Sequence, residues 1–155
     1  MKIVVATDGS RAGSAALRFA SNLVRGQGSG ELVVVTVCPG RSSASARSNG
    51  DGPVAQARRV LADASRVVQG RVRSVRFELI SSRSADEVPE AISRYADRKR
   101  ADLVVVGSEG RESLTEWVVG GTALRLIYVA RRPVTVVRAP RQRSRPASLG
   151  SRPLL

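Results

Sequence analysis

The residues of this sequence that are best suited to binding chemistry are glycines at a regular spacing. Gly107 and Gly110 stand three positions apart directly after an apolar run, and nine further residues lead to Gly120 and Gly121, which precede Thr122. Glycine permits positive φ and close approach of backbone amides to a ligand, and a helix N-terminus adds unpaired N–H groups and the positive end of its dipole. The spacing therefore predicts a cradle for phosphate groups.

The side chains present exclude several kinds of catalysis. The sequence contains no histidine and one cysteine, Cys38, which excludes an internal disulfide, Cys–His and Ser–His–Asp catalysis, and most zinc sites. No residue is placed as a strong general base, and Cys38 reads as a small buried hydrophobic residue. We therefore expect a binding protein, with at most slow hydrolysis of its ligand, rather than an enzyme.

Composition predicts one globular domain. The chain has 155 residues, of which 42% are hydrophobic, and this length suffices for one domain with its own core. No apolar run approaches the roughly 18 residues of a membrane helix. The N-terminus enters an apolar run at once, without the cleavage pattern of a signal peptide. We expect a cytoplasmic protein that makes no membrane contact.

The net charge of +13 raises the question of nucleic-acid binding. Five of the arginines lie in residues 138–155, and we expect residues 139–155 to be a disordered Arg/Pro/Ser-rich tail that follows a domain of residues 1–138. The other arginines occur on every expected helix, which is typical of a compositional bias. Because aromatic residues make up only 3% of the chain and no recognition motif occurs, nucleic-acid binding is not expected.

Strand and helix patterns alternate along the chain. Apolar runs predict strands at residues 2–7, 32–37, 72–80, 103–106 and 133–137. Helical spacing of apolar residues predicts helices that follow Ser10, span 54–68 and 122–131, and run from a capping box at Ser84–Glu87 to about residue 100. Residues 39–53 are expected to form a mobile loop. The pattern predicts an α/β fold with helices on both faces of a five-stranded, mostly parallel sheet.

The helical spacing also assigns buried faces. In the first helix these positions are Ala12, Ala15, Ala16, Phe19, Ala20 and Leu23, and in the last helix they are Ala123, Leu124, Ile127 and Ala130. For the strand order 3-2-1-4-5, the winding reverses between the strands that end at Asp8 and Gly107. Ligands of such sheets bind beside this reversal, at the carboxyl ends of the strands. Topology and glycine spacing therefore predict the same crevice.

With these residues in view, the sequence resembles the universal stress protein family, in particular its ATP-binding branch. The motif of that branch is Gly, two residues, Gly, nine residues, Gly and then Ser or Thr, and Gly107, Gly110 and Gly120 keep this spacing. Asp8 after the first strand, the phrase at residues 101–107 and the ending at 133–137 also match. The resemblance extends from residue 2 to about residue 138.

The resemblance implies a Rossmann-like fold, usually dimeric, that binds ATP, or ADP or AMP, with Mg²⁺ accompanying the nucleotide. It implies that Asp8 and Val37 lie near adenine and ribose and that the glycine amides hold phosphates. The implied nucleotide-binding residues are Ala6, Thr7, Asp8, Val37, Val106, Gly107, Glu109, Gly110, Gly120, Gly121 and Thr122.

Two positions depart from the family motif. Gly121 stands where the motif has a hydroxyl, which Thr122 supplies one position later. Glu109 stands where relatives often carry a neutral or basic side chain, and a carboxylate within about 4–6 Å of a triphosphate weakens binding unless it faces solvent or pairs with Arg111.

Two functions remain open from the sequence. One is a nucleotide-binding regulatory protein of the stress response that acts on an unidentified protein partner. The other is a dimeric interaction module of the same fold that binds no nucleotide, in which Asp8 only braces its turn. In both cases the valine-rich edge strand, with Val134, Val136 and Val137, is expected to pair with a second copy of the chain.

Overall fold

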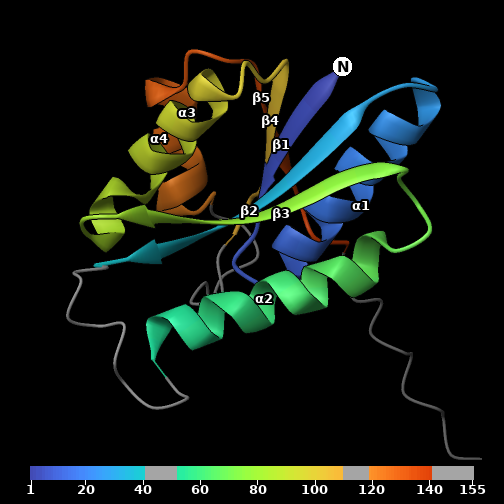
Figure 1. The fold of residues 1–155 in the computed structure, drawn as a ribbon. Helices are drawn as coiled ribbons and strands as arrows, with labels where there is room; N and C mark the ends of the chain where they lie inside the picture. The colour runs from blue at the N-terminus through green and yellow to red at the C-terminus, as the bar shows by residue number, and fades with distance from the viewer. Residues whose placement is uncertain (41–51, 110–118, 141–155) are drawn as a thin grey trace, which may run out of the picture.

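The computed structural model describes residues 1–40, 52–109 and 119–140, which form a five-stranded sheet covered by helices (Figure 1). The strands are β1 Lys2–Ala6, β2 Glu31–Pro39, β3 Ser74–Ser82, β4 Leu103–Gly107 and β5 Val134–Val137. Every pairing is parallel and the order is β3-β2-β1-β4-β5. The predicted α/β fold and strand order are confirmed, and the sheet is parallel throughout these strands.

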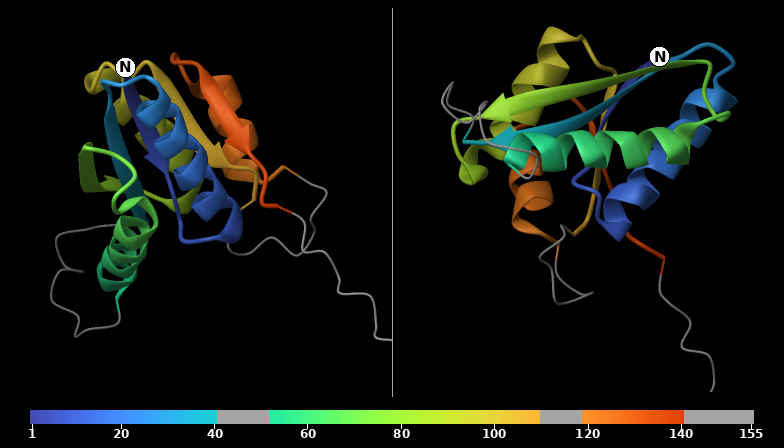
Figure 2. Two further views of the ribbon diagram at one scale, coloured as in Figure 1. Left: turned by 90° about the vertical axis from the view of Figure 1, so that its right-hand side faces the viewer. Right: turned by 60° about the horizontal axis from the view of Figure 1, so that its bottom comes forward.

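The helices divide between the two faces of the sheet. They are α1 Arg11–Gly26, α2 Pro53–Val68, α3 Val88–Arg98 and α4 Gly121–Val129. Figures 1 and 2 show α1 and α2 on one face and α3 and α4 on the other. Successive strand residues alternate between two cores: Val4 faces α3 and α4, whereas Ile3 and Val5 face α1 and α2. The central strands are buried on both faces, which explains their continuous apolar runs.

The buried face of α1 differs from the predicted one. Phe19 is 41% exposed, and the buried residues include Gly13, Leu17 and Ser21, which the apolar spacing did not select. Small residues let α1 approach the sheet closely, and the Ser21 hydroxyl is satisfied by donating to the Leu17 carbonyl at 2.7 Å. A prediction based on hydrophobicity alone therefore rotated the buried face of α1 too far toward Phe19.

The predicted capping box before α3 does not form. Ser84 makes no side-chain capping bond, and a 3₁₀ turn at Ala85–Glu87 precedes the helix. Pro89 falls in the first turn of α3 as predicted, where the absence of its N–H costs no helical bond. Farther along the helix, Lys99 pairs with Glu78 at 3.1 Å and so ties the end of α3 to β3.

Helix α4 buries a narrower face than predicted and ends at Val129 rather than residue 131. Ala123 and Leu126 are buried, but Leu124 is 48% exposed and Ile127 is 51% exposed. The helix covers the β4–β5 end of the sheet, so only one stripe of its surface meets the sheet and α3. Its opposite stripe, which includes Leu124, Ile127 and Tyr128, faces outward.

Two further expectations concern segments only partly described. Residues 41–51 of the predicted loop and residues 141–155 of the predicted tail lie outside the described residues. At the start of that tail, the Arg11 guanidinium donates to the Pro140 carbonyl at 3.0 Å. In the described part of the chain, no helix combines the length and apolar character needed to cross a membrane.

Candidate functional site

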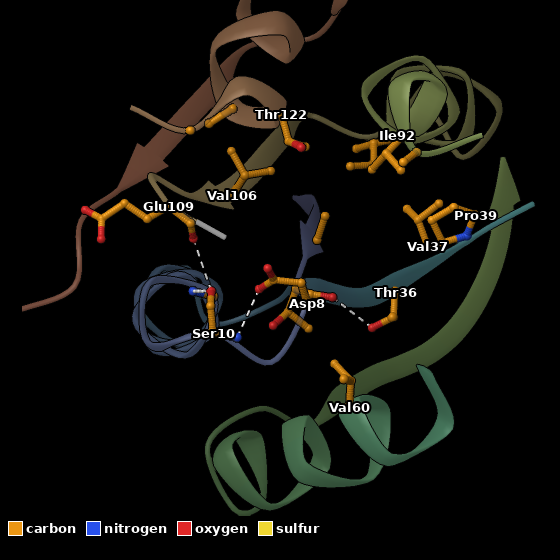
Figure 3. Close-up of a pocket in the computed structure, with 18 of the residues that line it drawn as sticks. Asp8, Ser10, Thr36, Val37, Pro39, Val60, Ile92, Val106, Glu109 and Thr122 are labelled. Carbon is orange, nitrogen blue, oxygen red and sulfur yellow. Dashed lines mark hydrogen bonds between the residues drawn. The ribbon is translucent and has the colours of Figure 1, made fainter. Parts of the chain in front are cut away.

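A cleft of about 660 Å³ opens at the carboxyl ends of β1, β2 and β4 (Figure 3). Its volume is that of a typical small-molecule pocket. It is walled by those strand ends and by the N-terminal turns of α2, α3 and α4. Ten predicted site residues line it: Ala6, Thr7, Asp8, Val37, Val106, Gly107, Glu109, Gly120, Gly121 and Thr122. The eleventh, Gly110, lies outside the described residues.

The turn after β1 forms the floor of the cleft and starts α1. The Asp8 carboxylate accepts from the Ser10 amide at 3.0 Å, and the Thr7 hydroxyl accepts from the Gly9 amide at 3.2 Å. Gly9 has φ of 82°, which a residue with a side chain rarely adopts. The Ser10 hydroxyl then caps α1, as predicted, by accepting from the Gly13 amide at 3.0 Å. Asp8 therefore braces this turn and also lines the cleft.

Gly107 serves the packing of the fold. A Cβ at this position would lie 2.6 Å from the Ala12 carbonyl carbon and 2.7 Å from the Gly13 nitrogen. These distances are far inside van der Waals contact, so the missing side chain allows the end of β4 to lie against the first turn of α1. Gly13 is similarly constrained, because its Cβ would lie 2.6 Å from the Thr7 hydroxyl oxygen. Sequence reasoning missed Gly13, although a glycine early in a helix was the available signal.

The N-terminus of α4 opens into the cleft, and the glycine before it does not have positive φ. Gly120 caps the helix with φ of −61°, and the glycines of positive φ among the described residues lie elsewhere in the chain. The Gly120 amide donates to the Ser108 carbonyl at 2.6 Å. This hydrogen bond places the start of α4 beside the end of β4. The amides of Gly121, Thr122 and Ala123 begin the helix and therefore have no helical acceptor. Of the two properties of glycine considered for this motif, the described residues Gly107, Gly120 and Gly121 do not use positive φ.

Glu109 lies at the rim with its carboxylate turned away from the centre of the cleft (Figure 3). Its backbone carbonyl accepts from the Ser10 hydroxyl at 3.2 Å, and its carboxylate accepts from the Ser108 hydroxyl at 3.2 Å. The repulsion of phosphates expected from Glu109 is weaker in this orientation, because the charge points outward. Its predicted partner, Arg111, lies outside the described residues.

An apolar region faces the glycine side of the cleft. Val37 from β2 lines the cleft together with Val88 and Ile92 from α3, and Val60 from α2 lines it apart from them. Thr36 supports this wall by donating from its hydroxyl to the Thr7 carbonyl at 2.9 Å. Sequence reasoning found Val37 only. Val60 lies within the helix predicted at residues 54–68, and helical spacing does not show which buried turn of a helix borders a cavity.

Acidic groups in the cleft are few. The lining carboxylates are Asp8 and Glu109, and only Asp8 is directed toward the centre (Figure 3). Within residues 1–40, 52–109 and 119–140, no three acidic or cysteine side chains gather closely enough to hold a metal ion. A divalent cation in this cleft would therefore depend on oxygen atoms brought by the ligand, and Asp8 is the lining carboxylate that faces the centre.

The sheet order and the position of the cleft define a doubly wound α/β protein with its crevice at the topological switch point. The model of the universal stress protein family matches residues 1–138, and the chain belongs to this family. The universal stress protein MJ0531 of Methanocaldococcus jannaschii is 34% identical over 68 residues, which are 44% of this chain and 38% of that relative. The match thus spans well under two thirds of the relative's length.

Solved structures show the same fold. A universal stress protein from Archaeoglobus fulgidus, in complex with dAMP, is 27% identical with a TM-score of 0.67, over 88% of this chain and 97% of that one. A universal stress protein in complex with cAMP is 20% identical with a TM-score of 0.71, over 90% of this chain and 98% of that one. The second likeness concerns the fold alone.

Proposed function

We propose that this protein binds an adenine nucleotide in the cleft and acts as a cytoplasmic regulatory protein in the stress response. The observation that carries the proposal is the pairing of an apolar wall with a helix N-terminus across one cleft. Ile92 and Val37 offer a surface for a flat base, and the first amides of α4 offer donors to phosphates. The dAMP complex of the A. fulgidus relative supports the same ligand class.

The arrangement orients the nucleotide from one wall to the other. Adenine lies against Val37, Val60 and Ile92, and the ribose lies near Asp8. The phosphates then reach the amides of Gly121 and Thr122, where the helix dipole favours negative charge. ATP is the proposed ligand, with ADP and AMP as its shorter forms.

Magnesium accompanies the nucleotide in this proposal. The ion would sit mainly on phosphate oxygens, with Asp8 on the protein side, and it would neutralise part of the phosphate charge. The described lining residues offer no strong general base, so we assign the protein a binding role rather than an enzymatic one. Binding then changes the surface that a protein partner recognises.

The test is to identify and measure the ligand. Mass spectrometry of material released from the purified protein should detect an adenine nucleotide, and calorimetry of ligand-free protein should give saturable heat with ATP, ADP or AMP in the presence of Mg²⁺. The absence of released nucleotide together with the absence of heat from all three would favour the interaction module that binds no nucleotide.

We further propose a twofold dimer formed through the β5 edge. β5 is the outer strand beside β4, and the outward stripe of α4 next to it exposes Leu124, Ile127 and Tyr128, of which Tyr128 is 80% exposed. An open edge and an adjacent apolar stripe are features that a second copy would cover. Light scattering should give a dimer mass, and Val136→Pro, which removes a strand donor, should give a monomer. A monomeric wild type would overturn this part.

A further inference from the structure

The end of the molecule opposite the cleft carries a row of arginines. The strands begin there, and α1, α3 and α4 end there, near the N-terminus in Figure 1. Arg73 precedes β3, Arg98 and Arg100 end α3, and Arg131 follows α4. We call these four residues the basic edge. All four are exposed.

Hydrogen bonds between neighbouring segments hold the β4–β5 part of the basic edge together. The Asp102 amide donates to the Lys2 carbonyl at 2.8 Å, which places the chain after Arg100 beside the start of β1. The Arg132 guanidinium donates to Asp97 at 2.9 Å, which joins the segment before β5 to the last turn of α3. The arginines at positions 98, 100 and 131 therefore share one surface.

Most acids near the basic edge pair with other cations, and the Asp102 carboxylate accepts from the Lys2 backbone amide at 2.7 Å. Glu31 pairs with both Lys2 and Arg76, at 3.2 and 2.9 Å. Asp97 pairs with Arg132, and Glu78 pairs with Lys99. Among the described residues, Arg73, Arg100 and Arg131 have no ion pair. Arg98 lies over the Tyr95 ring at 5.7 Å from its centroid. The basic edge thus keeps an excess of positive charge.

The attraction of cations to helix C-termini explains part of this charge, but it does not explain Arg100. Arg100 is the non-glycine residue with positive φ in the described part of the chain, at 52°. Its amide donates to the Asp97 carbonyl at 3.0 Å and the Ala101 amide donates to Ala96 at 2.9 Å, the two bonds of a Schellman motif. Glycine closes this motif without strain. An arginine that bears the strain and has no ion pair suggests a use for its guanidinium.

We propose that the basic edge binds the phosphate backbone of double-stranded nucleic acid. The guanidinium fork suits phosphate oxygens. Four strand spacings separate Arg73 from Arg131, about 19 Å across the sheet, and a duplex presents one charge per roughly 1.7 Å of its axis. At the described strand starts the exposed large apolar residue is Met1, and the exposed Ile127 and Tyr128 in the last turn of α4 belong to the stripe proposed above as the dimer surface.

The sequence alone predicted no nucleic-acid binding, because aromatic residues are few and no recognition motif occurs, and it treated the spread of arginine as a compositional bias. The fold brings helix ends and strand starts together at one edge, and so gathers arginines that are far apart in the sequence.

The test measures binding of the full chain to a fluorescein-labelled mixed-sequence DNA duplex by anisotropy at several salt concentrations. The edge variant is Arg73→Gln/Arg100→Gly/Arg131→Gln. Loss of three phosphate contacts should reduce the slope of log affinity against log salt by about 2 to 3, and affinity at 0.1 M salt should fall at least roughly tenfold. Circular dichroism should show an intact fold, since glycine relieves the Arg100 backbone.

The matched control removes the same charge elsewhere. Arg18, Arg58 and Arg138 are exposed and, in the described part of the chain, have no ion pair, so Arg18→Gln/Arg58→Gln/Arg138→Gln should bind within about threefold of wild type with a similar slope. Both variants keep the arginine-rich tail. Equal loss in the two variants, or no loss in the edge variant, would overturn the proposal. Polyglutamate that displaces the duplex at equal charge concentration would also overturn it, in favour of an acidic protein partner.

Discussion

Gly107 and Gly121 belong to the same glycine pattern, yet the structure predicts opposite effects of adding a methyl group to each. In Gly107→Ala the new Cβ would start 2.6 Å from the Ala12 carbonyl carbon and 2.7 Å from the Gly13 nitrogen. Both neighbours are backbone atoms of the first turn of α1, so they cannot rotate away as a side chain could. Either β4 or α1 must shift, and Gly107→Ala must therefore be destabilising.

The expected magnitude follows from overpacking. Forcing extra volume into a close backbone contact typically costs about 1 to 3 kcal/mol. For a chain of this size that lowers the melting temperature by about 2 to 12 °C. At Gly121, the first residue of α4, an added Cβ would meet no atom within 4 Å. Gly121→Ala should therefore leave stability unchanged or raise it by up to about 1 kcal/mol, because alanine has the higher helix propensity.

Urea unfolding followed by far-UV circular dichroism measures both effects. The midpoint should fall for Gly107→Ala and stay level or rise for Gly121→Ala, with the slope m unchanged in both variants. Calorimetry with ATP adds a second comparison, since Gly121→Ala keeps the amide that we assign to phosphate. Equal midpoints for wild type and Gly107→Ala would refute the packing role of Gly107.

Four further predictions test other parts of the molecule. Val37→Phe fills the apolar side of the cleft and should lower ATP affinity at least tenfold, about 1.4 kcal/mol by calorimetry; unchanged affinity would place the base elsewhere. Because the Glu109 carboxylate points outward, Glu109→Gln should change ATP affinity by less than about threefold, and a tenfold gain would mean that the charge faces the phosphates. The pKa of Glu78 is held below its ordinary value of 4.5 by the nearby Tyr95 hydroxyl, then by Lys99. Glu78 therefore stabilises the fold above that pH and loses this contribution as the pH falls through its folded pKa, so Lys99→Gln should lower the urea midpoint at pH 6 and approach wild type in strong acid. Deletion of residues 141–155 should leave the melting temperature within about 2 °C, and a larger drop would show that the tail packs on the domain.

The architecture of this protein can be predicted from its sequence. The runs around Val4, Val34 and Val105 are apolar on both faces, which is possible only for strands covered by helices on both sides. With four intervening helices, right-handed crossovers leave few arrangements of a parallel sheet. The predicted order and the position of the crevice after β1 and β4 are confirmed. These features depend on periodicity and chain order, which are local properties of the sequence.

The use of individual residues within that architecture depends on contacts that exist only after folding. Gly107 is required by the approach of α1, a contact between segments 95 residues apart in the chain, and spacing within one motif carries no information about it. The outward stripe of α4 follows from its place at the β4–β5 end of the sheet, where no described element covers that side of the helix. The cleft likewise acquires Val60 and Ile92 from two helices on opposite faces of the sheet, which folding brings to the same strand ends. Direction and distance between elements are set by packing across the sheet, and a pattern along the chain does not encode them.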